Sequence, residues 1–416
     1  MNTSETKSVV CLVVDRLRAS ALGAYGNTWS ETPEMDRLAA ESFLLDTALV
    51  DCPTIEAFYR GAWQGQHALQ ESDPPGPGFP AQCRDRGMRT VLVTDEPLVA
   101  EHPLTDAFDQ TLFLPPPSEI AVANAASIED TQIAQLMAVA MDQLDHLTSR
   151  GDDPFCLWIH SRGMAGPWDA PLALRERLLD EDDPTPMTGS EVPHERLPPD
   201  VDPDVVFSAN CAYAGQVAAL DTCLGLLAES LRDAPVGHQT LFTLMGARGM
   251  PLGEHGLLGP VADRLFGETL HVPWLIRLPS GTGATQRSDA LVGPGDMAAT
   301  LADWLGDQLD RSNFTSHSLL PLLRDDVQSL HDRLCMAIDG ERAIRTPGWF
   351  LRMPENALPE LYVKPDDRWE MNEVANRCEP VVEELVAAWD QFATICRSGE
   401  DRQPSPLSSV AESGFE

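Results

Sequence analysis

The chain has 416 residues, and its 43% hydrophobic content is enough for one large α/β domain or for a large domain with a smaller one. Its formal net charge is −36 at pH 7, and so acidic a surface repels nucleic acids and anionic membranes, which we exclude as partners. The 29 basic residues include only two lysines, Lys7 and Lys364.

Cysteine usage and the first residues predict a cytoplasmic protein. The nine cysteines show no Cys-x-x-Cys spacing, which is typical of free thiols in a reducing compartment. The apolar run in MNTSETKSVVCLVVD fits a strand better than the hydrophobic region of a signal peptide. No run of about 18 apolar residues predicts a membrane span. The sequence leaves a homo-oligomer open.

Apolar strand-like runs alternate with helical patterns through the first 310 residues. The near-continuous apolar strands and the alternation predict a mostly parallel sheet flanked by helices, in a domain spanning 1–310. In chain order the predicted elements are a strand at 8–14, a helix at 33–45, a strand at 88–94, a helix at 130–150, a strand at 154–160, a helix at 210–233, strands at 239–246 and 272–279, and a helix at 296–306.

Three segments depart from this pattern. Residues 166–205 are rich in Pro, Asp and Glu and predict a long exposed excursion near the mouth of the sheet, most acidic over 172–204. Residues 311–397 contain the short strand-like runs RLCMAIDG, GWFLRM and ELYVKP and then one helix, which predicts a smaller α+β subdomain. The Ser/Pro/Glu-rich tail, 398–416, is expected to be disordered.

Several stretches, in the right order along nearly the whole chain, resemble the sulfatase family of the alkaline phosphatase superfamily. The resemblance implies an alkaline phosphatase-like three-layer sandwich. The stretches are VVDRLRASALGAYGN with TPEMDRLAAES, GPWDAP (166–171), YAGQVAALDTCLGLLAESL, PLGEHGLLG (251–259), VPWLIRLP, DMAATLADWLG, HSLLPLL (317–323) and LYVKPDDRWEMNEVA (361–375).

The resemblance also implies a chemistry. Sulfatases bind a divalent metal, usually Ca²⁺, through oxygen and imidazole ligands at strand ends, as a hard cation prefers. A cysteine in a Cys-x-Pro-x-Arg motif, converted to formylglycine, attacks the sulfate. Lysines and histidines neutralise the sulfate oxygens and protonate the leaving group, while the metal stabilises developing charge.

The metal and nucleophile positions of this chain depart from that set. The paired metal acids fall on Asp15 and Arg16, so that one acid is kept and the other has the opposite charge. The nucleophile position falls on Asp51 in VDCPTIEAFYRG, and the arginine of the motif falls on Ile55. Cys52 stands one place late for the motif, and we expect it to be an unmodified small residue.

The positions that would neutralise the sulfate depart as well. The chain reads TDEPLV (94–99) where a lysine and a histidine are expected. Ala165 takes the place of another histidine, and Pro260 that of the last lysine. The second acid pair falls on Ala247 and Arg248.

These substitutions predict that ion pairs have replaced the metal. A guanidinium group cannot ligate a cation, and two unit charges 4 Å apart interact by about 4 kcal/mol at an effective dielectric constant near 20. We therefore expect no Ca²⁺ site and no other cofactor. The hypothesis pairs Asp15 and Asp51 with Arg16 and Arg248 in a pocket that also includes His255.

The sequence supports three interpretations. The preferred one is a degenerate, catalytically inactive sulfatase-like protein, for which the sequence leaves open an oxyanion-binding role of the two arginines. A second is a partner-binding protein of the same fold, with an unidentified protein partner. The alternative is a divergent hydrolase of sulfuric or phosphoric esters that uses Asp15 and Asp51 as Ca²⁺ ligands, or Asp51 as nucleophile. Under all three, Glu254 shapes the site and His67 and His160 are structural.

Overall fold

The computed structural model describes residues 7–70, 77–116, 124–149, 151, 153–260, 264–307, 314–398 and 402–414. Its internal contacts divide the chain into two units that do not follow chain order. The first unit comprises Met1–Leu44, Pro80–Ala262 and Val272–Arg287, and the second comprises Leu45–Phe79, Asp263–His271 and Ser288–Glu416. The second unit thus includes segments on the N-terminal side of residue 310 as well as the C-terminal part.

The central sheet has eight strands in the order β10-β2-β9-β7-β1-β5-β3-β4. The five strands from β7 to β4 are parallel, and β9 is antiparallel to both β7 and β2. The predicted mostly parallel sheet is confirmed. The strands are β1 (Ser8–Asp15), β2 (Phe43–Ala48), β3 (Arg89–Thr94), β4 (Gln110–Phe113), β5 (Phe155–Ser161), β7 (Thr240–Arg248), β9 (Trp274–Arg277) and β10 (Arg287–Val292).

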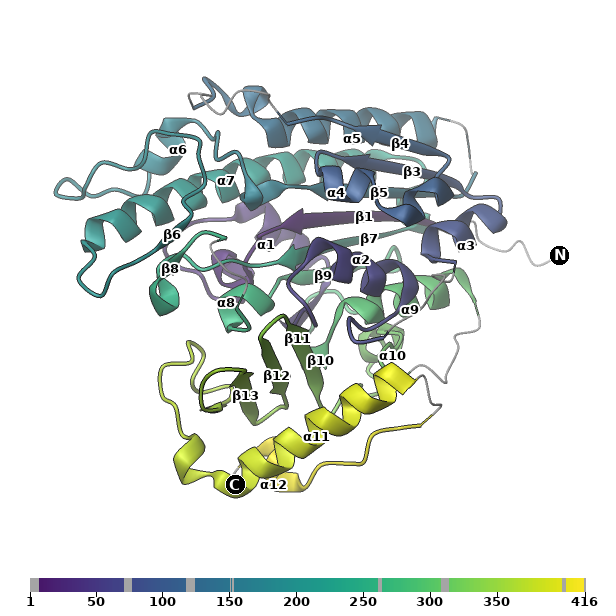
Figure 1. Cartoon of the computed structure of the whole chain (residues 1–416). Coiled ribbons are helices and arrows are strands. Elements are labelled where there is room, and N and C mark those ends of the chain that lie inside the picture. Colours follow the sequence, from purple (N-terminus) through teal and green to yellow (C-terminus); the bar gives the residue numbers. More distant parts are fainter. Residues whose placement is uncertain are drawn as a thin grey trace. The chain divides into compact units, whose positions relative to one another are not determined.

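Long helices of the first unit cover the parallel strands. In Figure 1, α5 (Gln132–Thr148) and α7 (Pro203–Asp233) run side by side, and α1 (Pro33–Ala40) also packs on α7. All eight residues of β1 are buried, which explains why this strand reads as a continuous apolar run. By length and composition α7 could cross a membrane, but 78% of its apolar window is buried inside the protein, as in a core helix.

The helix predicted at 33–45 is too long. It ends at Ala40, and the apolar residues that follow belong to β2, where Phe43 pairs with Ile276 of β9. The apolar residues at 43–45 fit the buried face of a helix as well as a buried strand, so the hydrophobic pattern alone does not show where the helix ends. The elements that the sequence did not predict include β2, β4, β10, α3 (Phe79–Asp85) and α4 (Pro97–Ala100).

One buried arginine holds the acidic excursion together. Its elements are α6 (Leu172–Glu176) and β6 (Glu195–Arg196), which pairs with β8 (Leu257–Leu258). Arg175 is fully buried and donates to the carbonyl oxygens of Met187, Gly189 and Trp168. The guanidinium therefore satisfies backbone groups that the excursion would otherwise bury without partners.

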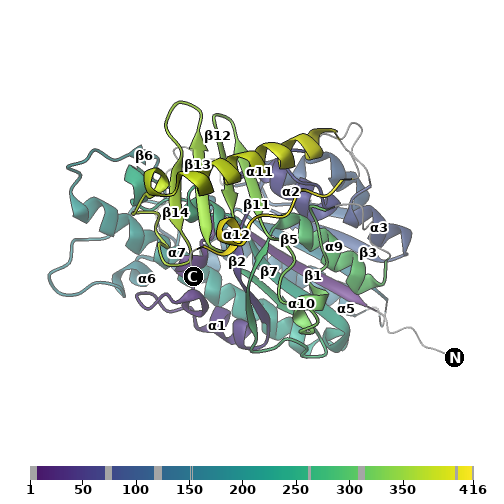
Figure 2. The same cartoon turned by 90° about the horizontal axis from the view of Figure 1, so that it is seen from below.

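The second unit contains a separate antiparallel sheet in the order β11-β12-β13-β14. Figure 2 shows α11 (Glu379–Ser398) lying across these strands, and its apolar face shares a core with them. The strands are β11 (Leu334–Ile338), β12 (Glu341–Arg345), β13 (Trp349–Pro354) and β14 (Glu360–Val363). Further helices of this unit include α2 (Ile55–Gln64), α8 (Gly267–Leu270), α9 (Pro294–Leu305) and α10 (Leu320–Leu323).

The tail is ordered where it is described. Helix α12 (Ser409–Ser413) packs near β13, since Trp349 Nε1 donates to Val410 O at 2.7 Å and Thr346 Oγ1 donates to Ala411 O at 2.9 Å. The expectation of a disordered 398–416 segment does not hold for residues 402–414. Ala411 is part of the core of the second unit and Leu407 packs against it, contacts that composition alone did not reveal.

Candidate functional site

The strand ends of the first unit bring Asp15 and Arg248 together. Strands β1 and β7 are parallel neighbours, and a register shift between Val14 and Asp15 places Asp15 opposite Arg248 at the last pair of the ladder. Both residues thus stand at the carboxyl edge of the sheet, where open α/β folds place their ligand sites. Such irregularities re-aim side chains at the ends of strands.

The two side chains form a forked ion pair. Arg248 Nε lies 2.9 Å from Asp15 Oδ1, and Arg248 Nη2 lies 3.1 Å from Oδ2. The backbone N–H of Arg16 also donates to Oδ1, at 2.9 Å. Both carboxylate oxygens are therefore engaged by donors, in the bidentate arrangement that gives arginine–carboxylate pairs their strength. The predicted pairing of Asp15 with Arg248 is present.

Burial and charge set the protonation states around this pair. Burial alone would raise the pKa of Asp15, but the charge and hydrogen bonds of Arg248, with Arg16 and His160, lower it below its usual value. Burial lowers the pKa of His160 to about 4, helped by Arg248 and Arg162 and opposed by Asp15. Near neutral pH, Asp15 is charged and His160 is neutral.

Arg16 lies on the same edge in a strained conformation. Its φ of 60° is in the left-handed region, which is uncommon for a residue with a side chain. Its Nη1 donates to Gly249 O at 3.0 Å, and the side chain is buried. The hydroxyl of Tyr213 donates to Arg16 O at 3.0 Å and fixes this turn. Arg16 thus points along the loop after β7 and adds positive charge beside Asp15.

A second buried ion pair borders the turn. Arg18 Nη2 lies 2.5 Å from Glu254 Oε1, and Glu254 Oε2 accepts from Leu252 N at 2.6 Å. Burial would raise the pKa of Glu254, but the charge and hydrogen bond of Arg18 lower it. The Arg18 backbone donates to the Tyr213 hydroxyl at 3.1 Å, and burial raises the pKa of Tyr213 to about 12.

The next strand ends carry an acid and an arginine. Asp95 follows β3, and its Oδ1 accepts from Arg162 N, just after β5, at 2.7 Å. Burial raises the pKa of Asp95 to about 7, although the hydrogen bond and charge of Arg162 lower it. Arg162 Nε also lies 3.5 Å from Glu96 Oε2. The edge therefore holds four arginines, at positions 16, 18, 162 and 248.

Comparison with known proteins decides the family. The sulfatase family model matches residues 7–307, about three quarters of the chain. The chain belongs to the sulfatase family. The multifunctional alkaline phosphatase superfamily protein PehA of Trinickia caryophylli is 26% identical over 130 residues, which cover 31% of this chain and 25% of PehA. The match thus spans about a quarter of the length of that curated relative.

Solved structures of this superfamily share the fold. The phosphonate monoester hydrolase of Agrobacterium radiobacter has a TM-score of 0.74 at 18% identity, covering 93% of this chain and 95% of its own. The phosphonate monoester hydrolase SpPMH of Silicibacter pomeroyi has a TM-score of 0.74 at 16% identity, covering 95% and 96%. BT1596, a 2-O GAG sulfatase, has a TM-score of 0.72 at 16% identity, covering 94% and 93%.

Within the sulfatase fold, the residues of this chain do not fit a Ca²⁺ site. The one acid kept at the paired metal position, Asp15, has both oxygens engaged by donors, and Arg248 stands at the other acid pair. Among the residues that the structure describes, no three His, Cys, Asp or Glu side chains are placed to hold a metal ion. A cation at Asp15 would displace the guanidinium and face two fixed positive charges.

Asp51, at the nucleophile position of the family, lies in the second unit. Asp51 Oδ2 accepts from Ala68 N at 2.7 Å and lies 3.7 Å from His67 Nε2. His67 Nε2 is also 2.8 Å from Cys335 O, consistent with its predicted structural role. The predicted grouping of Asp51 with Asp15 and Arg248 joins the two units and stays a prediction.

The other sequence-predicted residues take structural places. Ile55 begins α2, and Cys52 Sγ lies 3.6 Å from Thr54 Oγ1, which caps that helix. Ala165 lies in a turn of 3₁₀ helix, Gly163–Ala165. His255 lies in another such turn, Glu254–Gly256, with a φ of 52°.

Sequence reasoning missed four residues of the site: Arg18, Tyr213, Asp95 and Arg162. Asp95 could have been found, because it ends the strand-like run TVLVTD as Asp15 ends SVVCLVVD. Arg18 and Tyr213 gave no local signal, since their hydrogen bond joins residues 195 positions apart.

Proposed function

We propose that this sulfatase-fold protein does not hydrolyse esters and that the arginines at its strand ends bind a small oxyanion. The observation that carries the proposal is the forked pair between Arg248 and Asp15, which engages the one acid kept from the family metal pair. Because sulfatase chemistry requires a metal to polarise the ester, a guanidinium in its place supports binding without turnover.

The local charge favours an anion although the whole chain is strongly acidic. Four arginines at the edge face the carboxylates of Asp15, Glu96 and Glu254, while Asp95 is partly protonated near neutral pH because burial raises its pKa to about 7. His160 is neutral there, since burial lowers its pKa to about 4. The edge thus carries a small net positive charge, and guanidinium forks suit tetrahedral oxyanions.

The absence of the family's catalytic residues from their positions in this sequence also argues against hydrolysis. The two lysines of the chain are Lys7 and Lys364, so none stands at the family positions that neutralise the sulfate. Lys364 pairs with Glu370 in the second unit, at 2.6 Å. Asp51, at the nucleophile position, is a carboxylate and not a precursor of formylglycine. The hydrolase relatives show what the fold can do when these groups are present.

Two measurements on the purified full chain test this proposal. The first is hydrolysis of an aryl sulfate and of a phosphonate monoester, with and without Ca²⁺, for which we expect no turnover above buffer. The second is thermal unfolding in sulfate, phosphate, Ca²⁺ and chloride at equal ionic strength. A ligand present at 10 times its Kd stabilises by about 1.4 kcal/mol, which raises the unfolding temperature of a chain this long by roughly 1.6 °C.

The outcomes separate the three interpretations. Stabilisation by sulfate or phosphate but not by Ca²⁺, reduced in Arg162→Gln, supports the oxyanion site. Turnover that requires Ca²⁺ and is lost in Asp51→Asn would establish the divergent hydrolase instead. No turnover and no oxyanion effect would leave partner binding as the function of the fold.

A further inference from the structure

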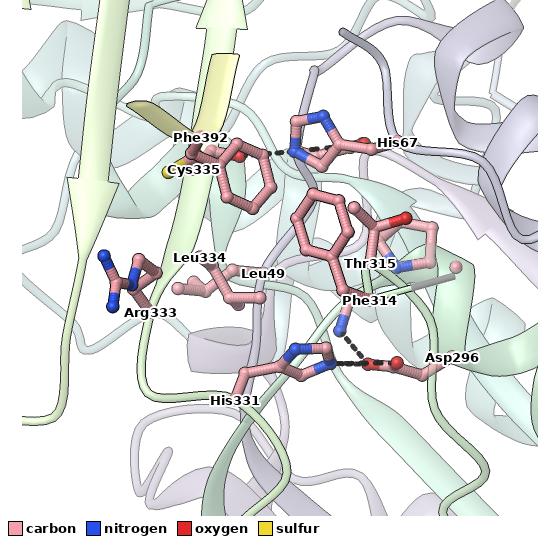
Figure 3. Close-up of a pocket in the computed structure, with 14 residues that line it drawn as sticks. Leu49, His67, Asp296, Phe314, Thr315, His331, Arg333, Leu334, Cys335 and Phe392 are labelled. Atoms are coloured by element: carbon pink, nitrogen blue, oxygen red, sulfur yellow. Dashed lines mark hydrogen bonds and ion pairs between the residues drawn. The ribbon is translucent and has the colours of Figure 1, made fainter. Parts of the chain in front are cut away.

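A small cavity in the second unit is bordered by two separate acid–histidine pairs. Figure 3 shows the pairs at opposite ends, with His67 at one end, His331 and Asp296 at the other, and the ring of Phe314 between them. The cavity has a volume of about 30 Å³. Because a water needs about 10–15 Å³ of such space, the cavity has room for about two.

Asp296 is the point at which three segments meet. It lies in the first turn of α9 and is 1% exposed. Its Oδ2 accepts from Gly293 N at 2.8 Å, and its Oδ1 accepts from His317 N at 2.7 Å. His331 Nε2 lies 3.0 Å from Oδ1 and 3.1 Å from Oδ2. One carboxylate thus connects the start of α9, the 314–319 segment and the chain entering β11.

The 314–319 segment makes further polar contacts with α9. Leu319 N donates to Thr300 Oγ1 at 2.8 Å, and Ser318 Oγ donates to Asp303 Oδ2 at 2.5 Å. Both contacts hold the C-terminal end of the segment. At its N-terminal end, Phe314 and Thr315 line the cavity, so the bond from His317 N to Asp296 is the nearest of these contacts to the cavity.

The charges around His331 favour its protonated form. Burial would lower the pKa of His331, but the charge and hydrogen bonds of Asp296 and the charge of Asp332 raise it. His317, whose ring centroid lies 4.8 Å from that of His331, has its pKa lowered by burial and by the charge of His331. Arg333 binds Asp332 through Nε at 2.9 Å, and Asp51 and His67 line the same cavity.

We propose that Asp296, His331 and His317 form a proton-operated clasp that holds the 314–319 segment closed over the cavity and loosens as the pH rises. Protonated His331 attracts the Asp296 carboxylate, which keeps that carboxylate in place to accept from His317 N. When His331 loses its proton, the attraction between two opposite charges is lost, and only a hydrogen bond from a neutral imidazole to the Asp296 carboxylate remains. Opening then begins at Phe314 and exposes the cavity.

The sign of the pH effect follows from the direction of the shift. The pKa of His331 is raised above its unfolded value of about 6.5. The clasp is therefore fully formed below about pH 6.5 and is lost as the pH rises through the folded-state pKa. Between the lowered pKa of His317 and the raised pKa of His331, only His331 is charged, so the two rings do not repel each other there.

Nuclear magnetic resonance on the full chain tests the proton. Imidazole resonances of the wild type are followed from pH 5 to pH 9 and assigned by their loss in His331→Gln and His317→Gln. We expect the His331 resonance to titrate above pH 6.5, and to titrate lower in Asp296→Asn. A His331 resonance that titrates below pH 6.5, or that does not respond to Asp296→Asn, would overturn the proposal.

Hydrogen–deuterium exchange tests the segment itself. After correction for the intrinsic rate, we expect amides in 314–319 to lose about tenfold protection between pH 6 and pH 8.5, the effect of a charge-assisted hydrogen bond. In His331→Gln the protection should be low at both pH values, whereas the exposed control His146→Gln should behave as the wild type. Protection that is independent of pH in the wild type, or a pH dependence that survives in His331→Gln, would refute the clasp.

Discussion

Replacing Arg248 by methionine is the sharpest perturbation of the strand-end pair. The side chain of Asp15 is 1% exposed and that of Arg248 is 16% exposed, so the pair is largely shielded from water. Removing one partner of a buried pair costs about 3–5 kcal/mol, because the other charge is left uncompensated. Arg16 N still donates to Asp15, so we expect about 3 kcal/mol, the lower end of that range.

The assay is urea unfolding followed by tryptophan fluorescence. Trp158, Trp168 and Trp274 are buried in the first unit and report its unfolding. Asp15→Asn/Arg248→Met removes both charges and should recover most of the loss, because no buried charge remains unpaired. The matched control is Arg232→Met, which breaks an exposed pair with Glu41, 42% and 35% exposed, and should cost less than about 1 kcal/mol.

The pH dependence provides a second check on the same variants. Because the folded-state pKa of Asp15 is lowered, its contribution is present above about pH 4 and is lost as the pH falls through the folded-state value. The difference between wild type and Arg248→Met should therefore shrink in acid. A loss no larger than that of Arg232→Met, or a double variant as unstable as the sum of its singles, would refute the reasoning.

Three further outcomes are expected. Burial raises the pKa of Asp95 to about 7, so its contribution to the free energy of unfolding should fall by about 1 kcal/mol per pH unit between pH 5 and pH 7. Urea unfolding at several pH values should show that this contribution is lost in Asp95→Asn, and an unchanged slope would contradict the assignment. Arg175→Gln should loosen the excursion and speed its cleavage by limited proteolysis at least several-fold, because hydrogen bonds from a charged group contribute about 1.5–3 kcal/mol each. The control Arg177→Gln, at an exposed neighbouring position, should leave the cleavage rate unchanged. Mass spectrometry should find an unmodified thiol at Cys52, and a formylglycine there would reopen the hydrolase interpretation.

The fold was largely predictable because its strongest signals are local. A fully buried parallel strand reads as a continuous apolar run, as SVVCLVVD does, and such a strand ends at its first charged residue. Asp15 could be placed at the edge of the sheet for this reason. Its pairing with Arg248 could be anticipated from the family positions, although the register shift that aligns the two residues left no trace in the sequence.

The predictions that failed concern features that long-range packing determines. The 33–45 helix was drawn too long because Phe43 and Leu44 suit either a helix face or a strand, and only pairing with β9 decides. Arg18 and Glu254 lie 236 positions apart, and the direction of each side chain is set by the turns around them. Arg175 reads as one more charged residue of an acidic segment, yet it is buried because four carbonyl or amide oxygens surround it.

The central claim is that an ion pair stands where the sulfatase family holds a metal. Calcium titration by calorimetry, on wild type and on the variant Arg16→Asp/Ala247→Asp/Arg248→Asn, tests it most directly. The account predicts no saturable Ca²⁺ binding by the wild type and measurable binding by the variant, which regains carboxylate and amide ligands around Asp15. One tightly bound Ca²⁺ per wild-type chain, lost in Asp15→Asn, would contradict it.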